Sequence, residues 1–362
     1  MDVAGRAHRL RRTFEEVGCD AMLVTKLVNI AWLTGFTGSA ALALVLADEI
    51  VFVTDGRYEQ QAAEELDRAG VAARLEIGLT AAAQREAVVS AAAGIGRLGL
   101  EANAVSWAQQ RSFADVWFPG AELVPTEHLV DGLRMVKDEG EVARIEAAAA
   151  IATAALATVG HRLRDRPTER DVALELDTEM RRLGAQASSF ATIVGSGPNG
   201  AKPHARPGER RIERGDLVVL DFGALLDGYC SDMTRTMMIG EPTPTQARML
   251  EVVAASQAAG VAAVRDGAEC VDVDRACREV IADAGWAHAF VHGTGHGLGL
   301  EIHEGPRVAS SSTGSLATGF VITVEPGVYL PEHGGVRIED TVMVTAQGCR
   351  ALTLAPKDPY LH

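Results

Sequence analysis

Cysteine is scarce in this chain, basic residues are outnumbered by acidic ones, and long apolar runs are missing. The five cysteines are odd in number and have no paired spacing, which argues against a disulfide framework and indicates a reducing compartment. The net charge of −15 argues against nucleic acid as a partner, because such a surface repels phosphate backbones. We find neither an 18-residue apolar run nor an apolar N-terminal signal stretch, so we expect no membrane partner and a cytoplasmic protein.

The composition is sufficient for about two folded domains. Of 362 residues, 47% are hydrophobic and 23% are charged, so a sizeable core is expected. A helix is predicted over 1–20, and the rest of residues 1–131 alternates strand and helix patterns, as in a small α/β domain. We interpret this part, which has no cluster of histidines or acids, as an oligomerisation or cleft-capping domain. A helix rich in alanine and glutamate is predicted over 133–163, so the second domain is placed at 132–362.

One stretch of the second domain, from Asp221 to Asp232, reads DFGALLDGYCSD. It joins two apolar runs, and Asp227-Gly228 between them favours a tight hairpin turn. A turn centred near residues 226–227 would place Asp221 opposite Asp232, where opposed side chains are roughly 4.5–5.5 Å apart. Opposed carboxylates repel each other, and a divalent cation would offset that repulsion. The alternative is that both acids flank a turn and face water.

A second pair of acids follows nearer the C-terminal end. Glu325 ends the β-rich run 320–325 and Glu339 lies in the next predicted strand, 336–344, so another cross-strand pair is permitted. Between the two pairs, residues 291–303 read VHGTGHGLGLEIH, with four glycines and three histidines. A lone histidine is more often structural than a ligand. Three histidines in a glycine-rich loop, between four acids, instead indicate a metal site.

The charges of this site indicate two cations. The four acids carry −4 and a neutral histidine adds nothing, so two divalent cations bring the sum to zero. Mixed oxygen and imidazole ligands favour manganese, cobalt, iron or zinc over calcium.

Taken together, these motifs resemble the Xaa-Pro peptidases, which are the prolidases and aminopeptidases P among the pita-bread metallopeptidases. The resemblance spans nearly the whole chain and rests on DFGALLDGYCSDMTRT, HGTGHGLGLEIHEGP, EPGVYL and VRIED, with LTGFTGSA and TDGRYEQQA in the N-terminal part. It implies an α+β protein in which a pita-bread catalytic domain follows a smaller, creatinase-like α/β domain. It also implies two divalent metal ions, with Mn²⁺ expected first and Co²⁺, Zn²⁺ or Fe²⁺ as alternatives. The implied metal ligands are Asp221, Asp232, His296, Glu325 and Glu339, with Asp232 and Glu339 bridging the two metals.

The resemblance further implies the reaction, which is hydrolysis of the bond between an N-terminal residue and a following proline in dipeptides or short peptides. In this hypothesis a hydroxide bridging the metals attacks the carbonyl before proline. Glu325 would pass on the proton of the water, and His303 would help to stabilise the oxyanion. The remaining site residues are His204 as a further catalytic candidate and His292, Tyr329 and Arg337 as substrate-binding or supporting residues.

Two alternatives stay open at this point. One is another carbon–nitrogen hydrolase or aminopeptidase of the same fold, and the other is a non-catalytic binding protein on the pita-bread scaffold. The complete ligand set and the N-terminal domain disfavour both, although a fold alone does not determine function. A homodimer is expected from the resemblance only. The sequence leaves open whether longer peptides are cleaved besides dipeptides, because both reactions use the same metal site.

Overall fold

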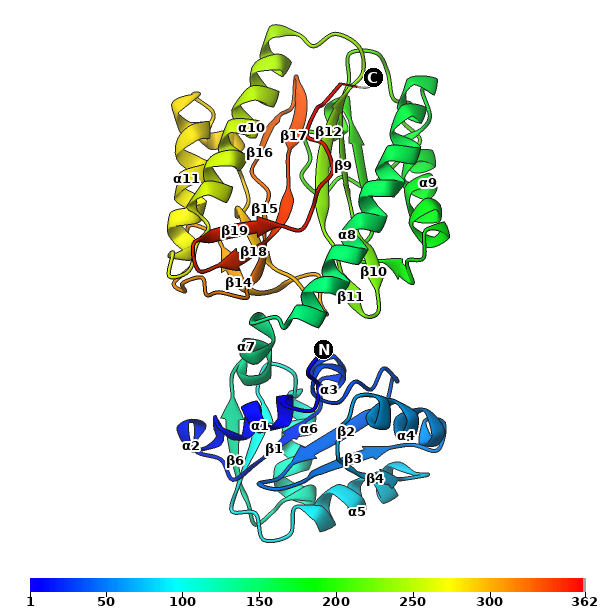
Figure 1. Ribbon diagram of the computed structural model, residues 1–362, viewed down its shortest axis with the longest axis vertical. Coiled ribbons are helices and arrows are strands. Elements are labelled where there is room, and N and C mark those ends of the chain that lie inside the picture. Colours follow the sequence, from blue (N-terminus) through cyan, green and yellow to red (C-terminus); the bar gives the residue numbers. More distant parts are fainter. Residues whose placement is uncertain (361–362) are drawn as a thin grey trace. The chain divides into compact units, whose positions relative to one another are not determined.

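The computed structural model describes residues 1–360, and the chain divides into two compact units, Met1–Arg134 and Met135–His362 (Figure 1). The division follows Arg134, whereas the sequence analysis placed the domain boundary after residue 131. Each unit mixes helices with strands, which is the content expected of an α+β protein.

The first unit is built on a six-stranded sheet with the order β4-β3-β2-β1-β5-β6. Strand β2 is antiparallel to both of its neighbours, β1 and β3. The other neighbouring pairs, β3–β4, β1–β5 and β5–β6, are parallel. The strands are β1 (Ala21–Val24), β2 (Ala41–Val45), β3 (Ile50–Thr54), β4 (Arg74–Ile77), β5 (Arg97–Glu101) and β6 (Glu122–Thr126). The helices are α1 (Arg6–Arg11), α2 (Phe14–Val17), α3 (Leu27–Thr34), α4 (Glu59–Arg68), α5 (Ala81–Ala91), α6 (Trp107–Ser112) and α7 (Leu129–Met135), the last of which crosses into the second unit.

Two expectations for the first unit are corrected. The helix predicted over 1–20 is two shorter helices, α1 and α2, and the second ends at Gly18, whose φ of 75° is left-handed. A further helix, α3, was not predicted, and it ends at Gly35 with a φ of 79°. Glycine adopts these angles at little cost because it has no Cβ, so both glycines can end a helix. Hydrophobic periodicity alone does not show where these helices end.

The second unit contains the same layout two times, a pair of helices followed by a sheet. Helices α8 and α9 precede a sheet with the order β8-β9-β12, and helices α10 and α11 precede a sheet that contains the order β13-β15-β18. In Figure 1 the strands of this unit lie between the two helix pairs. The helices are α8 (Glu139–Val159), α9 (Glu169–Arg182), α10 (Pro244–Ala263) and α11 (Cys270–Asp283). The strands are β7 (Ala187–Ser188), β8 (Ile193–Ser196), β9 (Leu217–Phe222), β10 (Ala224–Leu226), β11 (Tyr229–Cys230), β12 (Met233–Met238), β13 (Gly295–Gly297), β14 (Glu304–Val308), β15 (Val321–Val324), β16 (Gly327–Leu330), β17 (Gly334–Arg337), β18 (Asp340–Thr345) and β19 (Gly348–Ala351).

Helix α8 is shorter than the helix predicted over 133–163. It begins at Glu139 because Asp138 caps it, accepting the N–H of Glu141 at 2.8 Å while the Glu141 side chain reaches back to the N–H of Asp138. Residues Glu139–Asp165 are long and apolar enough to cross a membrane by composition alone. Ala148 and Ala152 nevertheless lie in the core with the strands β9 and β12, as expected of the core helix of a globular domain.

Candidate metal centre

The first acid pair lies on a hairpin whose turn is one residue further along the chain than predicted. Asp227 and Gly228 have φ values of 48° and 81°, as a type I′ turn requires. Position 221 is therefore paired with Thr234, not with Asp232, and the predicted register is wrong. A shift of the turn by one residue moves each pairing by two, so Asp232 stays on the same face as Asp221, as a diagonal neighbour. The carboxylates therefore still reach one site.

The second acid pair is directly opposed. Val324 pairs with Asp340, and on the far side of the gap Gly327 pairs with Arg337. Both pairings belong to one continuous register, in which Glu325 lies opposite Glu339. The cross-strand pair that the sequence permitted is thus formed where β15 leads into β16 and β17 leads into β18.

His296 reaches these acids because its neighbours are glycines. A Cβ on Gly295 would lie 2.0 Å from the Thr323 carbonyl oxygen, and a Cβ on Gly297 would lie 2.0 Å from that of Gly305. Only glycine allows β13 to approach so closely. The His296 Nδ1 is 3.0 Å from the Gly297 carbonyl oxygen. Nε2 then lies 3.6 Å from Asp232 Oδ2 and 3.5 Å from Glu325 Oε1.

The acids and histidines converge on one cavity of about 460 Å³ within the second unit. Nine of the ten predicted site residues line it, namely His204, Asp221, Asp232, His292, His296, His303, Glu325, Arg337 and Glu339. The tenth, Tyr329, does not line the cavity, and only 7% of it is exposed. Its hydroxyl instead lies 2.8 Å from His292 Nε2 and accepts from Arg337 at 2.6 Å, so Tyr329 supports two lining residues from behind.

Two buried carboxylate oxygens in this cavity have no hydrogen-bond partner within residues 1–360. They are Asp232 Oδ1 and Glu339 Oε1, and buried polar atoms of this kind normally have a partner. Ligand atoms of Asp232, His296 and Glu339 all lie within 4.8 Å of one another. The donor set therefore fits a divalent metal ion, which would satisfy both oxygens.

The remaining contacts of the acids fix their orientation. Glu339 uses its other oxygen, Oε2, to accept from the Thr234 hydroxyl at 2.8 Å. Arg337 donates to Asp221 Oδ2 at 2.6 Å and to Thr234 Oγ1 at 3.1 Å. Such outer partners hold metal ligands in place. Arg337 also lines the cavity, so its predicted substrate-binding or supporting role stays a prediction.

Burial raises the pKa of three of the acids. The pKa of Glu325 is raised to about 8, and burial together with neighbouring acids raises the pKa values of Asp232 and Glu339. Burial lowers the pKa of His296 to about 4, so its imidazole is neutral near pH 7, the form that binds a metal.

Comparison with known proteins agrees with this chemistry. The model of metallopeptidase family M24 matches residues 143–346, and that of the creatinase/prolidase N-terminal domain matches residues 6–136. The chain belongs to metallopeptidase family M24. An uncharacterised peptidase of Bacillus subtilis, YqhT, is 41% identical to this M24 peptidase over 98% of the chain and 99% of its own length. A Xaa-Pro dipeptidase of Pyrococcus horikoshii is 33% identical over 99% of each. The solved structure of a Xaa-Pro dipeptidase from Bacillus anthracis superposes with a TM-score of 0.94 at 36% identity, covering 99% of this chain and all of that one (100%).

These findings confirm the family and the fold class predicted from the motifs. The M24 peptidase has a pita-bread catalytic part after a creatinase-type N-terminal part, and it is a metallopeptidase. The relatives and the solved structure named above are all called peptidases or dipeptidases, which disfavours the non-catalytic alternative.

The cavity of the M24 peptidase has lining residues that the sequence analysis did not identify. Among them are the apolar Phe190, Ile193 and Ile302 and the acid Glu304. Another is Arg307, which lies on β14 directly opposite His296. Only its place eleven residues after His296 could have drawn attention to it, and without the register of β13 and β14 that spacing has no structural meaning.

Proposed function

We propose that this peptidase hydrolyses the bond between an N-terminal residue and a following proline, with two divalent metal ions and with Mn²⁺ as the first metal to test. The observation that supports this most is the convergence of four carboxylates and a neutral imidazole on one cavity, with two buried oxygens left unpaired. The substrate class comes from the relatives, since those from Pyrococcus horikoshii and Bacillus anthracis bear the name Xaa-Pro dipeptidase.

The metal ions would be held by the five predicted ligands. When bound, they would lower the pKa of a water molecule and polarise the carbonyl before proline. The residues that would hold them are Asp221, Asp232, His296, Glu325 and Glu339.

Other groups of the chain handle the proton and the substrate. Glu325 is placed to accept a proton, because it borders the cavity and its Oε1 accepts a long hydrogen bond from Thr323 Oγ1, at 3.3 Å. His303 lines the same cavity with its ring 4.4 Å from that of His296, and it would donate a hydrogen bond to the carbonyl oxygen of the substrate. His204 and His292 border the same cavity and would contact the proline side of the substrate. The scissile nitrogen carries no hydrogen, so no acceptor for an N–H is needed there.

The protein stripped of metal should cleave Ala-Pro only after Mn²⁺, Co²⁺ or Zn²⁺ is restored. Hydrolysis of Ala-Pro and of Ala-Pro-Ala, followed by chromatography, measures this directly. Cleavage of the dipeptide alone would make the protein a dipeptidase, and cleavage of both would make it an aminopeptidase. The proposal fails if no metal restores cleavage of either peptide and none binds.

Arg307 is expected to select dipeptides by their free carboxylate. Its guanidinium is the cationic group on β14 opposite His296, and a free carboxylate is the partner that a guanidinium binds best. Arg307→Ala should raise KM for Ala-Pro by about 10–100-fold, as one charge-assisted hydrogen bond of about 1.5–3 kcal/mol is lost. Steady-state kinetics at saturating metal provide the measurement.

Ala-Pro-amide is the matched substrate, because it lacks the charge that Arg307 would bind. The Arg307→Ala variant should cleave it as fast as the wild type does, and Arg275→Ala, an exposed arginine on α11, should change neither substrate. An equal loss on Ala-Pro and its amide would show that Arg307 does not read the carboxylate.

A cytoplasmic homodimer is part of this proposal. All five cysteines are free, which agrees with a reducing compartment. Light scattering of the purified protein tests the dimer, and a single mass near 38.2 kDa would contradict it.

A further inference from the structure

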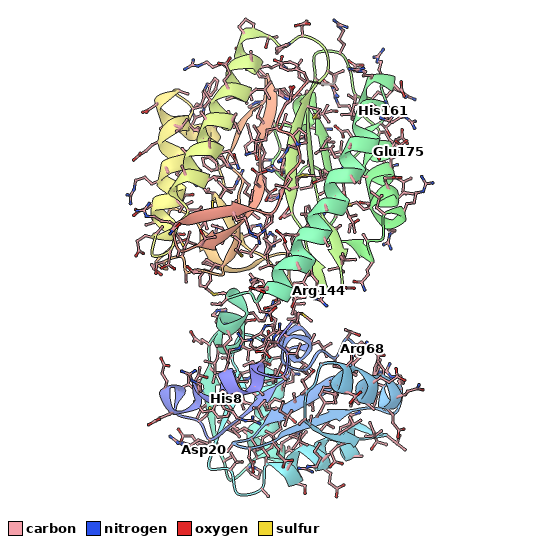
Figure 2. All side chains as sticks on the ribbon, viewed as in Figure 1. His8, Asp20, Arg68, Arg144, His161 and Glu175 are labelled. Carbon is pink, nitrogen blue, oxygen red and sulfur yellow. The ribbon has the colours of Figure 1, made fainter. Side chains whose placement is uncertain are left out.

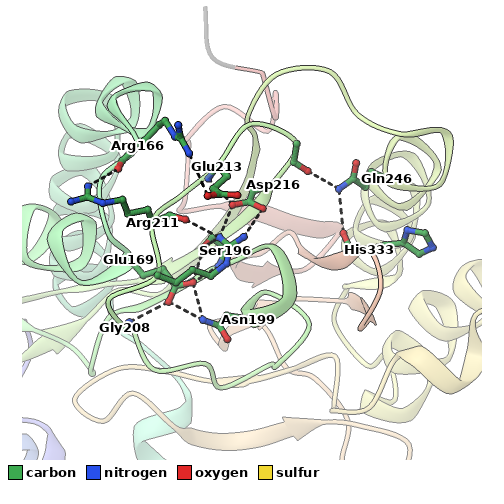
Figure 3. A network of polar contacts seen from close by, with 12 residues as sticks. Arg166, Glu169, Ser196, Asn199, Gly208, Arg211, Glu213, Asp216, Gln246 and His333 are labelled. Carbon is green, nitrogen blue, oxygen red and sulfur yellow. Dashed lines mark hydrogen bonds and ion pairs between the residues drawn. The ribbon is translucent and has the colours of Figure 1, made fainter.

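Glu169, the first residue of α9, is a fully buried acid that does not line the metal cavity. Its Oε1 accepts from both the N–H and the hydroxyl of Ser196, at 2.9 and 2.7 Å. Asn199 donates to both oxygens at 3.1 Å, and the N–H of Gly208 donates to Oε2 at 3.1 Å (Figure 3). Every one of these donors lies in one loop, 27 to 39 residues further along the chain.

That loop, residues 196–208, carries His204 to the cavity and is called the His204 loop here. Its first residue, Ser196, and its last, Gly208, are both tied to the carboxylate of Glu169, so this one side chain closes the base of the loop. Arg210 strengthens the same point, since it donates to Ser196 Oγ at 2.6 Å and forms a two-pronged pair with Asp216. Charge-assisted hydrogen bonds between buried groups are strong and fix geometry.

Asp274 on α11 holds a second cavity-lining segment through hydrogen bonds to its backbone and side chain. It is 1% exposed, and its Oδ1 accepts from both the N–H and the hydroxyl of Thr294, at 3.1 and 2.9 Å. Arg278 pairs with Asp274 at 2.6 Å and donates to the carbonyl oxygens of Phe290 and His292. The segment 290–294, called the His292 segment here, is thereby held against α11.

The two arrangements share one pattern. In each, one oxygen of a buried helix carboxylate accepts from both the N–H and the hydroxyl of a serine or threonine. An arginine adds a further contact, Arg210 to the Ser196 hydroxyl and Arg278 to Asp274 itself. Ser196 ends β8 and Thr294 directly precedes β13, and these strands occupy corresponding places in the repeated layout. Neither acid lines the cavity, whereas the histidine on each held segment does.

We propose that Glu169 and Asp274 are matching positioning residues of the peptidase reaction, Glu169 acting through His204 and Asp274 acting through His292. This inference rests on the proposed function, which assigns both histidines to the substrate. Catalysis depends on substrate-contacting groups being held within a fraction of an ångström, and loops meet that demand only when buried contacts hold them.

Glu169→Gln and Asp274→Asn test the proposal. Each keeps the volume of the side chain but removes acceptors; in Glu169→Gln, for example, an amide group would face the N–H of Gly208. We expect kcat/KM on Ala-Pro at saturating Mn²⁺ to fall about 10–100-fold in each, with the affinity for Mn²⁺ within about twofold of the wild type.

Double variants decide whether the effect passes through the histidine. A residue that acts only through His204 has nothing left to lose once that histidine is gone. Glu169→Gln should therefore cost less than about twofold in the His204→Ala background and keep its full effect in the His292→Ala background. Asp274→Asn should show the reverse. Glu175→Gln changes a half-exposed acid of the same helix α9 that pairs with Arg162 (Figure 2). It is the control and should leave kcat/KM unchanged.

Hydrogen exchange supplies a readout that needs no substrate. Amides of the His204 loop should exchange faster in Glu169→Gln, and amides of the His292 segment should exchange faster in Asp274→Asn, each without a change in the other segment. If Glu169→Gln does not fold, Asn199→Ala is the milder variant, because it removes two of the five hydrogen bonds between the loop and Glu169, and it replaces Glu169→Gln in the same cycle.

The outcomes separate the inference from the proposed function. An active wild type whose variants lose the same factor in both histidine backgrounds overturns the inference, because the acids would then act on the whole fold. Unchanged exchange in both segments overturns it too. A wild type that cleaves no Xaa-Pro substrate with any metal overturns the proposed function itself, and the positioning roles fall with it.

Discussion

Glu339→Gln is expected to abolish peptidase activity, with a fall in kcat of at least about 10³-fold, or about 4 kcal/mol in the barrier. Glu339 Oε1 is buried without a partner, while Oε2 is held by the Thr234 hydroxyl. The amide would leave the site one negative charge short and would lose one of the two oxygens that a bridging ligand needs. Asp232→Asn should behave in the same way, since Asp232 Oδ1 is the other unpaired oxygen.

The measurement is kcat on Ala-Pro at saturating Mn²⁺, with the metal content of each variant determined by elemental analysis. Glu332→Gln changes an exposed acid between β16 and β17 and is the matched control, which should keep full activity and full metal content. If Glu339→Gln keeps most of its rate with the metal bound, Glu339 is not a bridging ligand.

The metal site could be predicted from the sequence although the predicted register of the first hairpin is wrong. The turn at Asp227-Gly228 was placed one residue too early, and the pairing of Asp221 was therefore wrong by two positions. Side chains alternate with a period of two, so an error of two positions leaves every residue on its correct face. An error of one position would have sent Asp232 to the opposite face. The Asp-Gly pair marks a turn in the sequence, whereas the register depends on which residues take positive φ.

Other residues gave no local signal. Tyr329 was predicted to bind substrate or to support the site, and no local pattern indicates that its hydroxyl contacts His292 and Arg337 from behind the cavity. Glu169 looks like an ordinary first-turn acid of a helix, a position that acids favour anyway. Its donors come from the His204 loop, so only the folded chain shows what the carboxylate does. Long-range contacts of this kind leave no trace in hydrophobic periodicity.

Metal-free protein is expected to become less stable as the pH rises from 6.5 to 8. Burial raises the pKa of Glu325 from its usual 4.5 to about 8, so the folded chain holds a proton that the unfolded chain has lost. The unfolded state then binds fewer protons, and the free energy of unfolding falls with pH by up to about 1.4 kcal/mol per unit for each such acid. Asp232 and Glu339, whose pKa values burial also raises, act in the same direction.

Two histidines explain why the expected loss of stability begins only at about pH 6.5. Burial lowers the pKa values of His292 and His296 from 6.5 to about 4, so between these values the unfolded chain binds more protons than the folded chain does. Their contribution to stability therefore rises with pH up to about 6.5, against that of the acids. Above 6.5 the histidines of the unfolded chain lose their remaining charge, so their contribution levels off and the slope that the acids set prevails.

Urea unfolding of the metal-stripped protein at pH 6.5, 7, 7.5 and 8, a range set by these pKa values, measures the slope. Glu325→Gln removes the acid whose pKa is raised to about 8 and should flatten the slope. Added Mn²⁺ should reverse the loss, because a bound cation favours ionised acids, so the gain in stability on adding metal should grow with pH. Stability that rises between pH 6.5 and 8 without metal would mean that these acids are already ionised in the folded chain. The unpaired oxygens of Asp232 and Glu339 would then have a partner other than a metal ion.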